Sequence, residues 1–132
     1  MRFRTSLLAA LAGLATIAAS TGAYAGAADY AFEPVRVDVK NGPGSELAVK
    51  LVHKPTGRAV PGAVLFRTRL DMAPDNMAGM TARHEATPSS EAGVYSFKAD
   101  LTMEGGWAFR IMAKVPGEPE TVQGSVVFKA TD

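Results

Sequence analysis

The sequence of 132 residues contains no cysteine, a single tryptophan and almost no excess charge of either sign. The absence of cysteine excludes disulfides, thiolate zinc sites, a cysteine nucleophile and a lipid anchor on cysteine. With 14 Lys and Arg against 13 Asp and Glu, the net charge of +1 gives no electrostatic footprint for nucleic acid. The whole chain is 47% hydrophobic and 20% charged. This composition and length are typical of a globular protein of one domain.

The first 25 residues have the three-part pattern of a secretory signal. Arg2 and Arg4 supply a positive start, residues 7–19 form an uncharged apolar run, and residues 23–25 (AYA) place small side chains where a signal peptidase cleaves. The apolar run is short against the roughly 20 residues that span a bilayer, so an uncleaved anchor is the weaker interpretation. We expect a signal peptide over 1–25, cleaved after about Ala25, and a periplasmic or secreted protein without a membrane span.

Residues 26–132 are predicted to form short strands separated by turns rich in Gly, Pro and Asn. An additional short edge strand is expected over residues 81–86, and no segment sustains a helical period. The sequence therefore predicts an all-β, immunoglobulin-like antiparallel β-sandwich of about seven strands over 35–132, preceded by a loosely held N-terminal arm over 26–34. The apolar faces expected for the main strands are those of Val35, Val37 and Val39; of Leu47, Val49 and Leu51; of Val64, Phe66, Thr68 and Leu70; of Tyr95, Phe97 and Leu101; of Trp107, Phe109, Ile111 and Ala113; and of Val122, Val126 and Phe128.

The sequence gives little support for catalysis. It has two histidines, His53 and His84, and contains neither a G-x-S-x-G nucleophile turn nor an H-E-x-x-H metal motif. His53 has the parity of a core face and is interpreted as a packing residue. Asp71 and Asp75 are close in sequence, but they lack the ligand spacing of a calcium loop. We therefore expect no enzymatic activity.

One segment, residues 72–80, has unusual chemistry for the loop that it is expected to form. Met72, Met77 and Met80 lie among Pro, Asp, Asn and Gly, and His84 follows. Thioether sulfur is a soft, uncharged ligand and imidazole is intermediate, a combination that suits Cu(I) or Ag(I) better than Zn²⁺ or Mg²⁺. Met103 is a further candidate ligand if the sandwich brings its corner to this loop. The pattern thus favours a Cu(I) site.

Two other interpretations of these methionines stay open. Met72 shares the parity of Leu70 and so can cap the core, while Met77 and Met80 can pack beneath the loop. Alternatively, the methionines form an adaptable surface for a protein partner. Metal binding, partner binding and packing therefore all remain as explanations.

Several short motifs resemble the YtkA-like/FixH-like family. They are residues 57–63 (GRAVPGA), the methionine segment 72–80, residues 93–95 (GVY) and residues 103–107 (MEGGW), in the order that the family has them. The resemblance covers about residues 35–129, nearly all of the chain after the expected cleavage site.

The resemblance implies an exported accessory domain with an immunoglobulin-like fold and no catalytic activity. Members of the family are associated with heavy-metal efflux or with the assembly of copper-containing oxidases, so the implied partners are an envelope transporter or an oxidase-assembly protein. Met72, Met77 and Met80 align with a loop that is frequently rich in methionine in this family. The alternative is a protein-interaction module of the cell envelope that docks on such a complex without binding metal.

Overall fold

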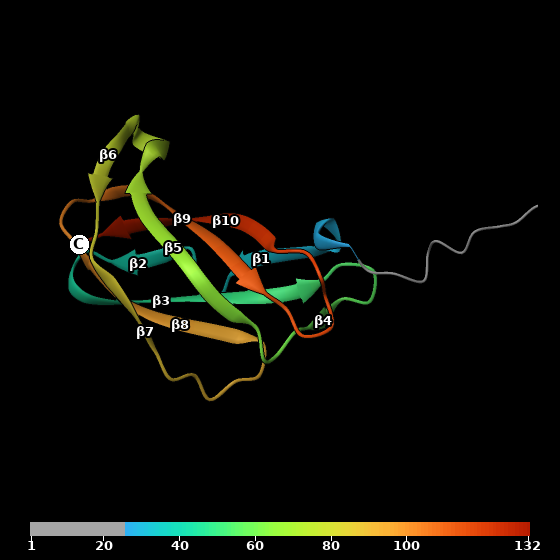
Figure 1. The fold of residues 1–132 in the computed structure, drawn as a ribbon. Helices are drawn as coiled ribbons and strands as arrows, with labels where there is room; N and C mark the ends of the chain where they lie inside the picture. Colours follow the sequence, from blue (N-terminus) through green and yellow to red (C-terminus); the bar gives the residue numbers. More distant parts are fainter. Residues whose placement is uncertain (1–25) are drawn as a thin grey trace, which may run out of the picture.

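Two β-sheets pack face to face in the computed structural model, which describes residues 26–132 (Figure 1). The signal peptide expected over 1–25 lies outside the described residues. No helix in the described part of the chain is long and apolar enough to cross a membrane. The elements in chain order are η2 (Ala27–Asp29), β1 (Tyr30–Pro34), β2 (Asp38–Lys40), β3 (Gly42–His53), β4 (Arg58–Ala59), β5 (Val64–Met72), η3 (Ala73–Asp75), β6 (Met77–Thr81), β7 (His84–Thr87), β8 (Val94–Leu101), β9 (Gly105–Lys114) and β10 (Val122–Thr131).

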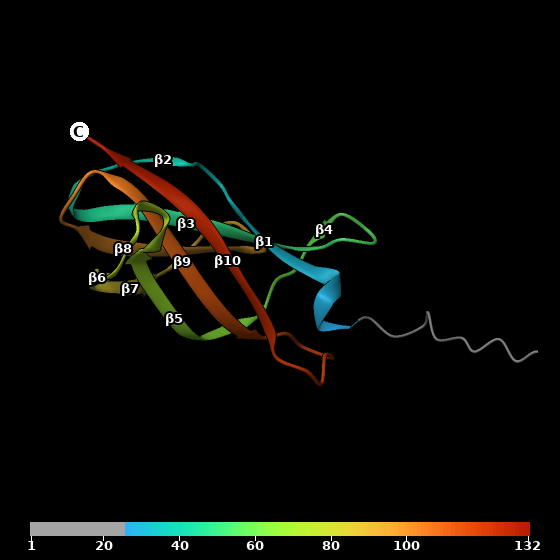
Figure 2. The same ribbon diagram turned by 90° about the horizontal axis from the view of Figure 1, so that it is seen from above.

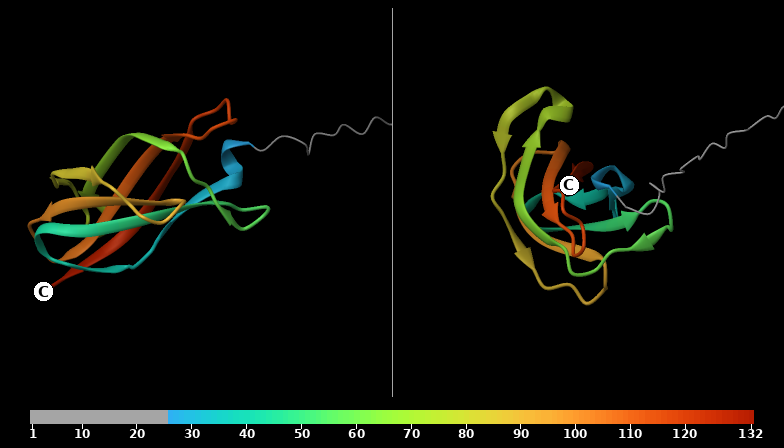
Figure 3. Two further views of the ribbon diagram at one scale, coloured as in Figure 1. Left: turned by 90° about the horizontal axis from the view of Figure 1, so that it is seen from below. Right: turned by 45° about the vertical axis from the view of Figure 1, so that its right-hand side comes forward.

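The first sheet has the order β1-β3-β8-β7, with β4 also paired to β3, and the second has the order β2-β10-β9-β5-β6. Strand β2 runs parallel to β10, while the other pairs are antiparallel. Figure 2 shows β9 and β10 crossing over β3 and β8, and both views of Figure 3 place the β5–β6 hairpin and β4 at opposite ends. The predicted all-β sandwich is confirmed.

The core is built mainly by β9 and β10, whose alternation follows the prediction. Trp107 and Phe109 on β9, with Phe128 opposite Trp107 on β10, are fully buried between the sheets. Burying side chains of this size removes the largest apolar areas in the chain from water, so they dominate the stabilisation of the sandwich. The Trp107 indole N–H donates to the carbonyl of Met103 at 3.0 Å, which satisfies its one polar group.

The segment before Val39 differs from the prediction. The arm expected over 26–34 contains strand β1, which pairs with β3, and Phe32 is buried with its ring over Gly124 of β10. Val35 and Val37, expected on a buried face, are instead about half exposed, because the chain crosses there from the first sheet to the second. Only Val39 of that expected face enters the core.

A bulge interrupts the alternation expected for β5. The register of β5 against β9 shifts between Leu65 and Arg67, so Leu65 packs toward the core while Val64 and Phe66 are exposed. An inserted residue reverses the side-chain parity on one side of a bulge. The prediction that Val64 and Phe66 share the buried face of Leu70 is therefore wrong.

Tyr95 forms the hydrogen-bonded corner that its place after a turn suggests. Its hydroxyl donates to the carbonyl of Val60 at 2.8 Å and accepts the N–H of Ala63 at 2.9 Å. These two bonds fasten the connection between β4 and β5 to β8, in the manner of a tyrosine at a sandwich corner.

Candidate functional site

The methionine segment forms a hairpin, not the loop expected over residues 72–80. Met72 ends β5, η3 makes the turn, and Asn76 adopts a left-handed conformation (φ 63°) that asparagine tolerates better than most residues. Strand β6 then pairs with the end of β5. The hairpin extends past the neighbouring strands at one end of the sandwich (Figure 1).

Met72 belongs to the core. Its side chain is fully buried, and it lies beside the start of β9 at Gly105. This agrees with the interpretation that Met72 continues the inward parity of Leu70, which is also buried. The Met72 thioether is therefore closed to solvent in this conformation.

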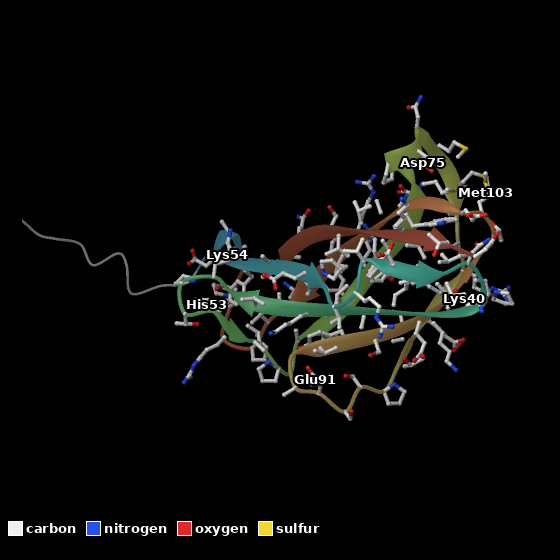
Figure 4. The ribbon with its side chains drawn as sticks, turned by 180° about the vertical axis from the view of Figure 1, so that it is seen from behind. Lys40, His53, Lys54, Asp75, Glu91 and Met103 are labelled. Carbon is white, nitrogen blue, oxygen red and sulfur yellow. The ribbon has the colours of Figure 1, made fainter. Side chains whose placement is uncertain are left out.

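The other three methionines of the predicted set are not enclosed in this way. Met77 packs against the edge of the core and is half-buried, whereas Met80 and Met103 are 37% and 38% exposed. Figure 4 shows Met103 at the same end of the molecule as Asp75 of the hairpin, and opposite His53. The sandwich thus brings the corner of Met103 to the end that carries β6.

A backbone contact fixes this arrangement. The N–H of Gly106 donates to a carboxylate oxygen of Asp75 at 3.2 Å, which fastens the start of β9 to η3. Gly105 has φ +133° and lies directly against the Asp75 carboxylate, a place that leaves no room for a Cβ. The start of β9, which follows the turn of Met103, is therefore held against the hairpin of Met77 and Met80 by contacts of its backbone with the Asp75 side chain.

Carboxylates are also present at the same corner. Glu104 follows Met103, and hydrogen bonding and charge repulsion with Asp132 raise the pKa of Glu104. Asp75 contributes a third carboxylate through η3. We name the surface formed by Met77, Met80, Met103, Asp75 and Glu104 the methionine end. It combines soft sulfur ligands with nearby carboxylates, two features that favour a cation.

His84 does not join the methionine end but connects the two sheets. From β7 in the first sheet, its Nε2 lies 2.6 Å from the hydroxyl of Thr68 on β5 in the second, and its Nδ1 lies 3.1 Å from the carbonyl of Ala82. A carbonyl only accepts, so Nδ1 carries the proton and Nε2 accepts the Thr68 hydroxyl. The ring also packs edge-on against Phe109, with ring centroids 5.3 Å apart. Both nitrogens of this predicted ligand are thus occupied.

Asp71 forms a buried ionic cluster that sequence reasoning missed. Its side chain is 1% exposed, and its carboxylate accepts the Nε–H groups of Arg69 at 2.8 Å and of Arg110 at 3.0 Å. The N–H of Ala73 donates to the other oxygen at 2.9 Å. The spacing Arg69-x-Asp71 places both side chains on one face of a strand, which was the available signal. The partner on β9 is a pairing between distant segments that spacing does not reveal.

The pKa of Asp71 reflects two opposing effects. Burial by itself raises it, but the hydrogen bonds from Arg110, from the Ala73 backbone and from Arg69 outweigh burial and lower the pKa from 3.8 to about 2. The same contact raises the pKa of Arg110. The cluster therefore remains fully ionised at neutral pH.

Within residues 26–132, no group of three or more His, Asp or Glu side chains gathers in a way that could hold a metal ion. The donors present at the methionine end are the thioethers of the three methionines and the carboxylates of Asp75 and Glu104. The thioethers are soft and neutral, and they match Cu(I) or Ag(I) far better than Ca²⁺ or Mg²⁺.

Comparison with known proteins gives one family match. The family model described as YtkA-like matches residues 24–112, which is more than half of the chain. Among solved structures, the crystal structure of the Lin-41 filamin domain aligns with 76% of this chain and 94% of that chain, at 18% sequence identity and a TM-score of 0.41. No curated protein matches the chain at a significant level.

Proposed function

The chain belongs to the YtkA-like family, and on that premise we propose that it is an exported accessory domain of the cell envelope that binds a soft monovalent cation, Cu(I), at the methionine end. It resides in the periplasm or outside the cell, acts without catalysing a reaction, and holds or passes metal to a larger efflux or cuproprotein-assembly machine. Its partner is then an envelope transporter or an oxidase-assembly protein.

The observation that carries the proposal is the exposure of Met80 on β6 and of Met103, at the end of the sandwich that carries the β5–β6 hairpin (Figure 1, Figure 4). A methionine that serves only packing is normally enclosed, as Met72 is. Two thioethers at the surface, with that of Met77 half-buried on β6, leave soft ligands open to a solute. The carboxylates of Asp75 and Glu104 add an attraction for positive charge.

The burial of each methionine narrows the ligand set. Met77, Met80 and Met103 are the proposed ligands, and three neutral thioethers suit a site that gives up its metal by ligand exchange. Met72 would have to leave the core to bind, and His84 would have to give up its bond to Thr68. Both are therefore outside the proposed set, although the sequence pattern includes them.

A Cu(I) competition titration under anaerobic conditions tests the proposal, with a chromophoric Cu(I) chelator as competitor. The test variant replaces Met77, Met80 and Met103 by leucine, and the matched control is Met112→Leu, a half-buried methionine on β9 outside the methionine end. We expect one Cu(I) per chain in the native protein and in the control, and at least tenfold weaker binding in the triple variant. Failure of the native protein to compete, or undiminished binding by the triple variant, overturns the proposal.

The second candidate function is an interaction module that docks on an envelope complex without metal. One observation favours it, namely a charged face on the second sheet, formed by residues other than those of the methionine end. The ligand that we infer for that face is independent of Cu(I) binding.

A further inference from the structure

Three arginines gather on the outer face of the second sheet. Arg67 and Arg69 lie on β5, and Arg110 lies directly opposite Arg69 on β9. Met112 of β9 is opposite Arg67, and Ser125 of β10 is opposite Arg110. Residues in register on neighbouring strands share a face of the sheet, so these side chains form one continuous surface.

This surface is hollowed. A shallow cavity of about 430 Å³ lies over the three strands, and its lining includes the three arginines together with Met112, Gln123 and Ser125. We name these six residues the arginine face. Two exposed apolar side chains are its neighbours along the strands. Phe66 directly precedes Arg67 in the bulge of β5. Val127 is two residues after Ser125 on β10 and lies opposite Ala108 of β9.

The positive charge of the arginine face is only partly balanced. Asp71 supplies one negative charge against three positive charges. Its carboxylate accepts the Nε–H of Arg69 and the Nε–H of Arg110. It also accepts a longer bond, of 3.5 Å, from Nη2 of Arg110. Nη2 of Arg69 donates to the carbonyl of Ala78. Among the described residues, no hydrogen bond uses the guanidinium of Arg67 or the Nη1 groups of Arg69 and Arg110.

Two of the cations are held in place before any ligand arrives. Like charges directly opposite one another on a sheet repel, and the buried carboxylate of Asp71 offsets this for Arg69 and Arg110. Their side chains remain 52% and 49% exposed. A guanidinium fixed in this way keeps its Nη1 group available for a carboxylate at a smaller entropic cost.

We propose that the arginine face docks an acidic, extended segment of a partner protein, with carboxylates at alternate positions. Arg67 and Arg69 are two residues apart on a strand, which sets their Cα atoms at roughly 7 Å. Alternate residues of an extended peptide have the same separation, so an Asp/Glu-x-Asp/Glu segment lying along β5 pairs with both. Phe66, Met112 and Val127 supply apolar contacts of the kind that interfaces between proteins enrich.

The shape and charge of the surface favour a protein segment over other anions. The cavity extends over three strands and is shallow, whereas small-molecule sites are concave and bury most of their ligand. The net charge of the whole chain is close to zero, so no long-range field attracts a polyanion such as nucleic acid. The local excess of arginine instead complements a short acidic segment.

Fluorescence anisotropy tests the inference with a labelled synthetic peptide, acetyl-Gly-Glu-Ala-Glu-Ala-Glu-Gly, and with a matched peptide in which glutamine replaces each glutamate. Arg67→Gln is the test variant, because no hydrogen bond in the described structure depends on Arg67. Lys98→Gln is the control, since it removes the same charge from an exposed position on β8 in the other sheet. Trp107 fluorescence verifies that each variant is folded.

We expect the glutamate peptide to bind at least tenfold more tightly than the glutamine peptide, and binding to weaken as salt rises. Arg67→Gln should weaken binding by about threefold to tenfold and Arg67→Glu by more, whereas Lys98→Gln should leave it unchanged. Equal binding of the two peptides, or equal loss in Arg67→Gln and Lys98→Gln, overturns the inference. So does displacement of the peptide by inorganic phosphate or by anionic phosphatidylglycerol vesicles at equal charge concentration, since the surface would then be a general anion site.

Discussion

Arg110 and Asp71 form a charged hydrogen bond across the β5–β9 pair, with Arg110 Nε 3.0 Å from Asp71 Oδ2. The carboxylate is buried while the guanidinium reaches the surface, so the bond links the interior of the second sheet to the arginine face. Removal of the buried carboxylate leaves Arg69 and Arg110, which face each other, without the anion that they share.

Asp71→Asn should destabilise the protein at neutral pH and remove part of its acid sensitivity. Because folding lowers the pKa of Asp71 from 3.8 to about 2, its stabilisation is complete above about pH 4 and disappears as the pH falls through 2. We expect a loss of about 2 kcal/mol in the free energy of unfolding at pH 7. Urea unfolding at pH 7, 4 and 2 measures it, and the gap between native protein and variant should close toward pH 2.

The matched control for this prediction is Glu85→Gln, an exposed carboxylate on β7. It should leave both the stability and its pH dependence unchanged within about 0.5 kcal/mol. A native protein whose pH profile matches that of Asp71→Asn would show that Asp71 does not stabilise the fold through its charge.

Thr68→Val should weaken the connection that His84 makes between the sheets. The substitution keeps the shape of the side chain but removes the hydroxyl that donates to Nε2, leaving a half-buried acceptor without its partner. We expect a loss of about 1–2 kcal/mol in the free energy of unfolding. Imidazole ¹⁵N shifts should show Nδ1 protonated in the neutral ring of the native protein. The opposite tautomer would contradict the assigned donor to Ala82.

Gly105→Ala should disturb the methionine end. A Cβ at this position meets the Asp75 carboxylate and comes within 2.9 Å of the Met72 methyl group, and φ +133° is unfavourable for alanine. We expect a loss of at least about 2 kcal/mol in the free energy of unfolding. Gly79→Ala is the control, because a Cβ there meets nothing within 4 Å and its φ is not positive. Equal melting temperatures for the two variants would contradict the packing of β9 against η3.

Oxidation by hydrogen peroxide should distinguish the methionines by their exposure. Met80 and Met103 should form sulfoxides first, and Met72 last, because reagent reaches only exposed sulfur. Ag(I), which binds thioethers as Cu(I) does but is not itself oxidised, should slow the reaction at Met80 and Met103 and leave Met112 unaffected. Peptide mass spectrometry after a short exposure gives the order. Uniform protection of all methionines by Ag(I) would argue against a local site.

The sequence predicts the fold well where one face of a strand is buried throughout. On β9 the predicted inward face of Trp107, Phe109 and Ile111 is buried, because a register slip would turn all three outward. The resemblance of residues 57–63 and 103–107 to the YtkA-like family is likewise confirmed by the family match over residues 24–112.

Prediction fails where the chain changes sheets or gains a residue. Val35 and Val37 have a strand pattern but lie in a crossover, and the bulge beside Leu65 reverses the parity of Val64 and Phe66. Neither a crossover nor a bulge has a local signature in these residues. Burial of Met72 could be inferred from parity with Leu70, whereas the pairing of His84 with Thr68 depends on contact between two sheets.

The parallel pairing of β2 with β10 has a consequence for the order in which the molecule assembles. Asp38 is in register with Lys129, so two segments from opposite ends of the described chain complete the second sheet together. Until β10 is available, β9 presents an unpaired edge and Phe32 lacks the strand against which it packs. Contacts of such long range form slowly. A chain in which β10 has not yet paired therefore remains open and prone to association, and its safe folding depends on how quickly β10 joins the sheet.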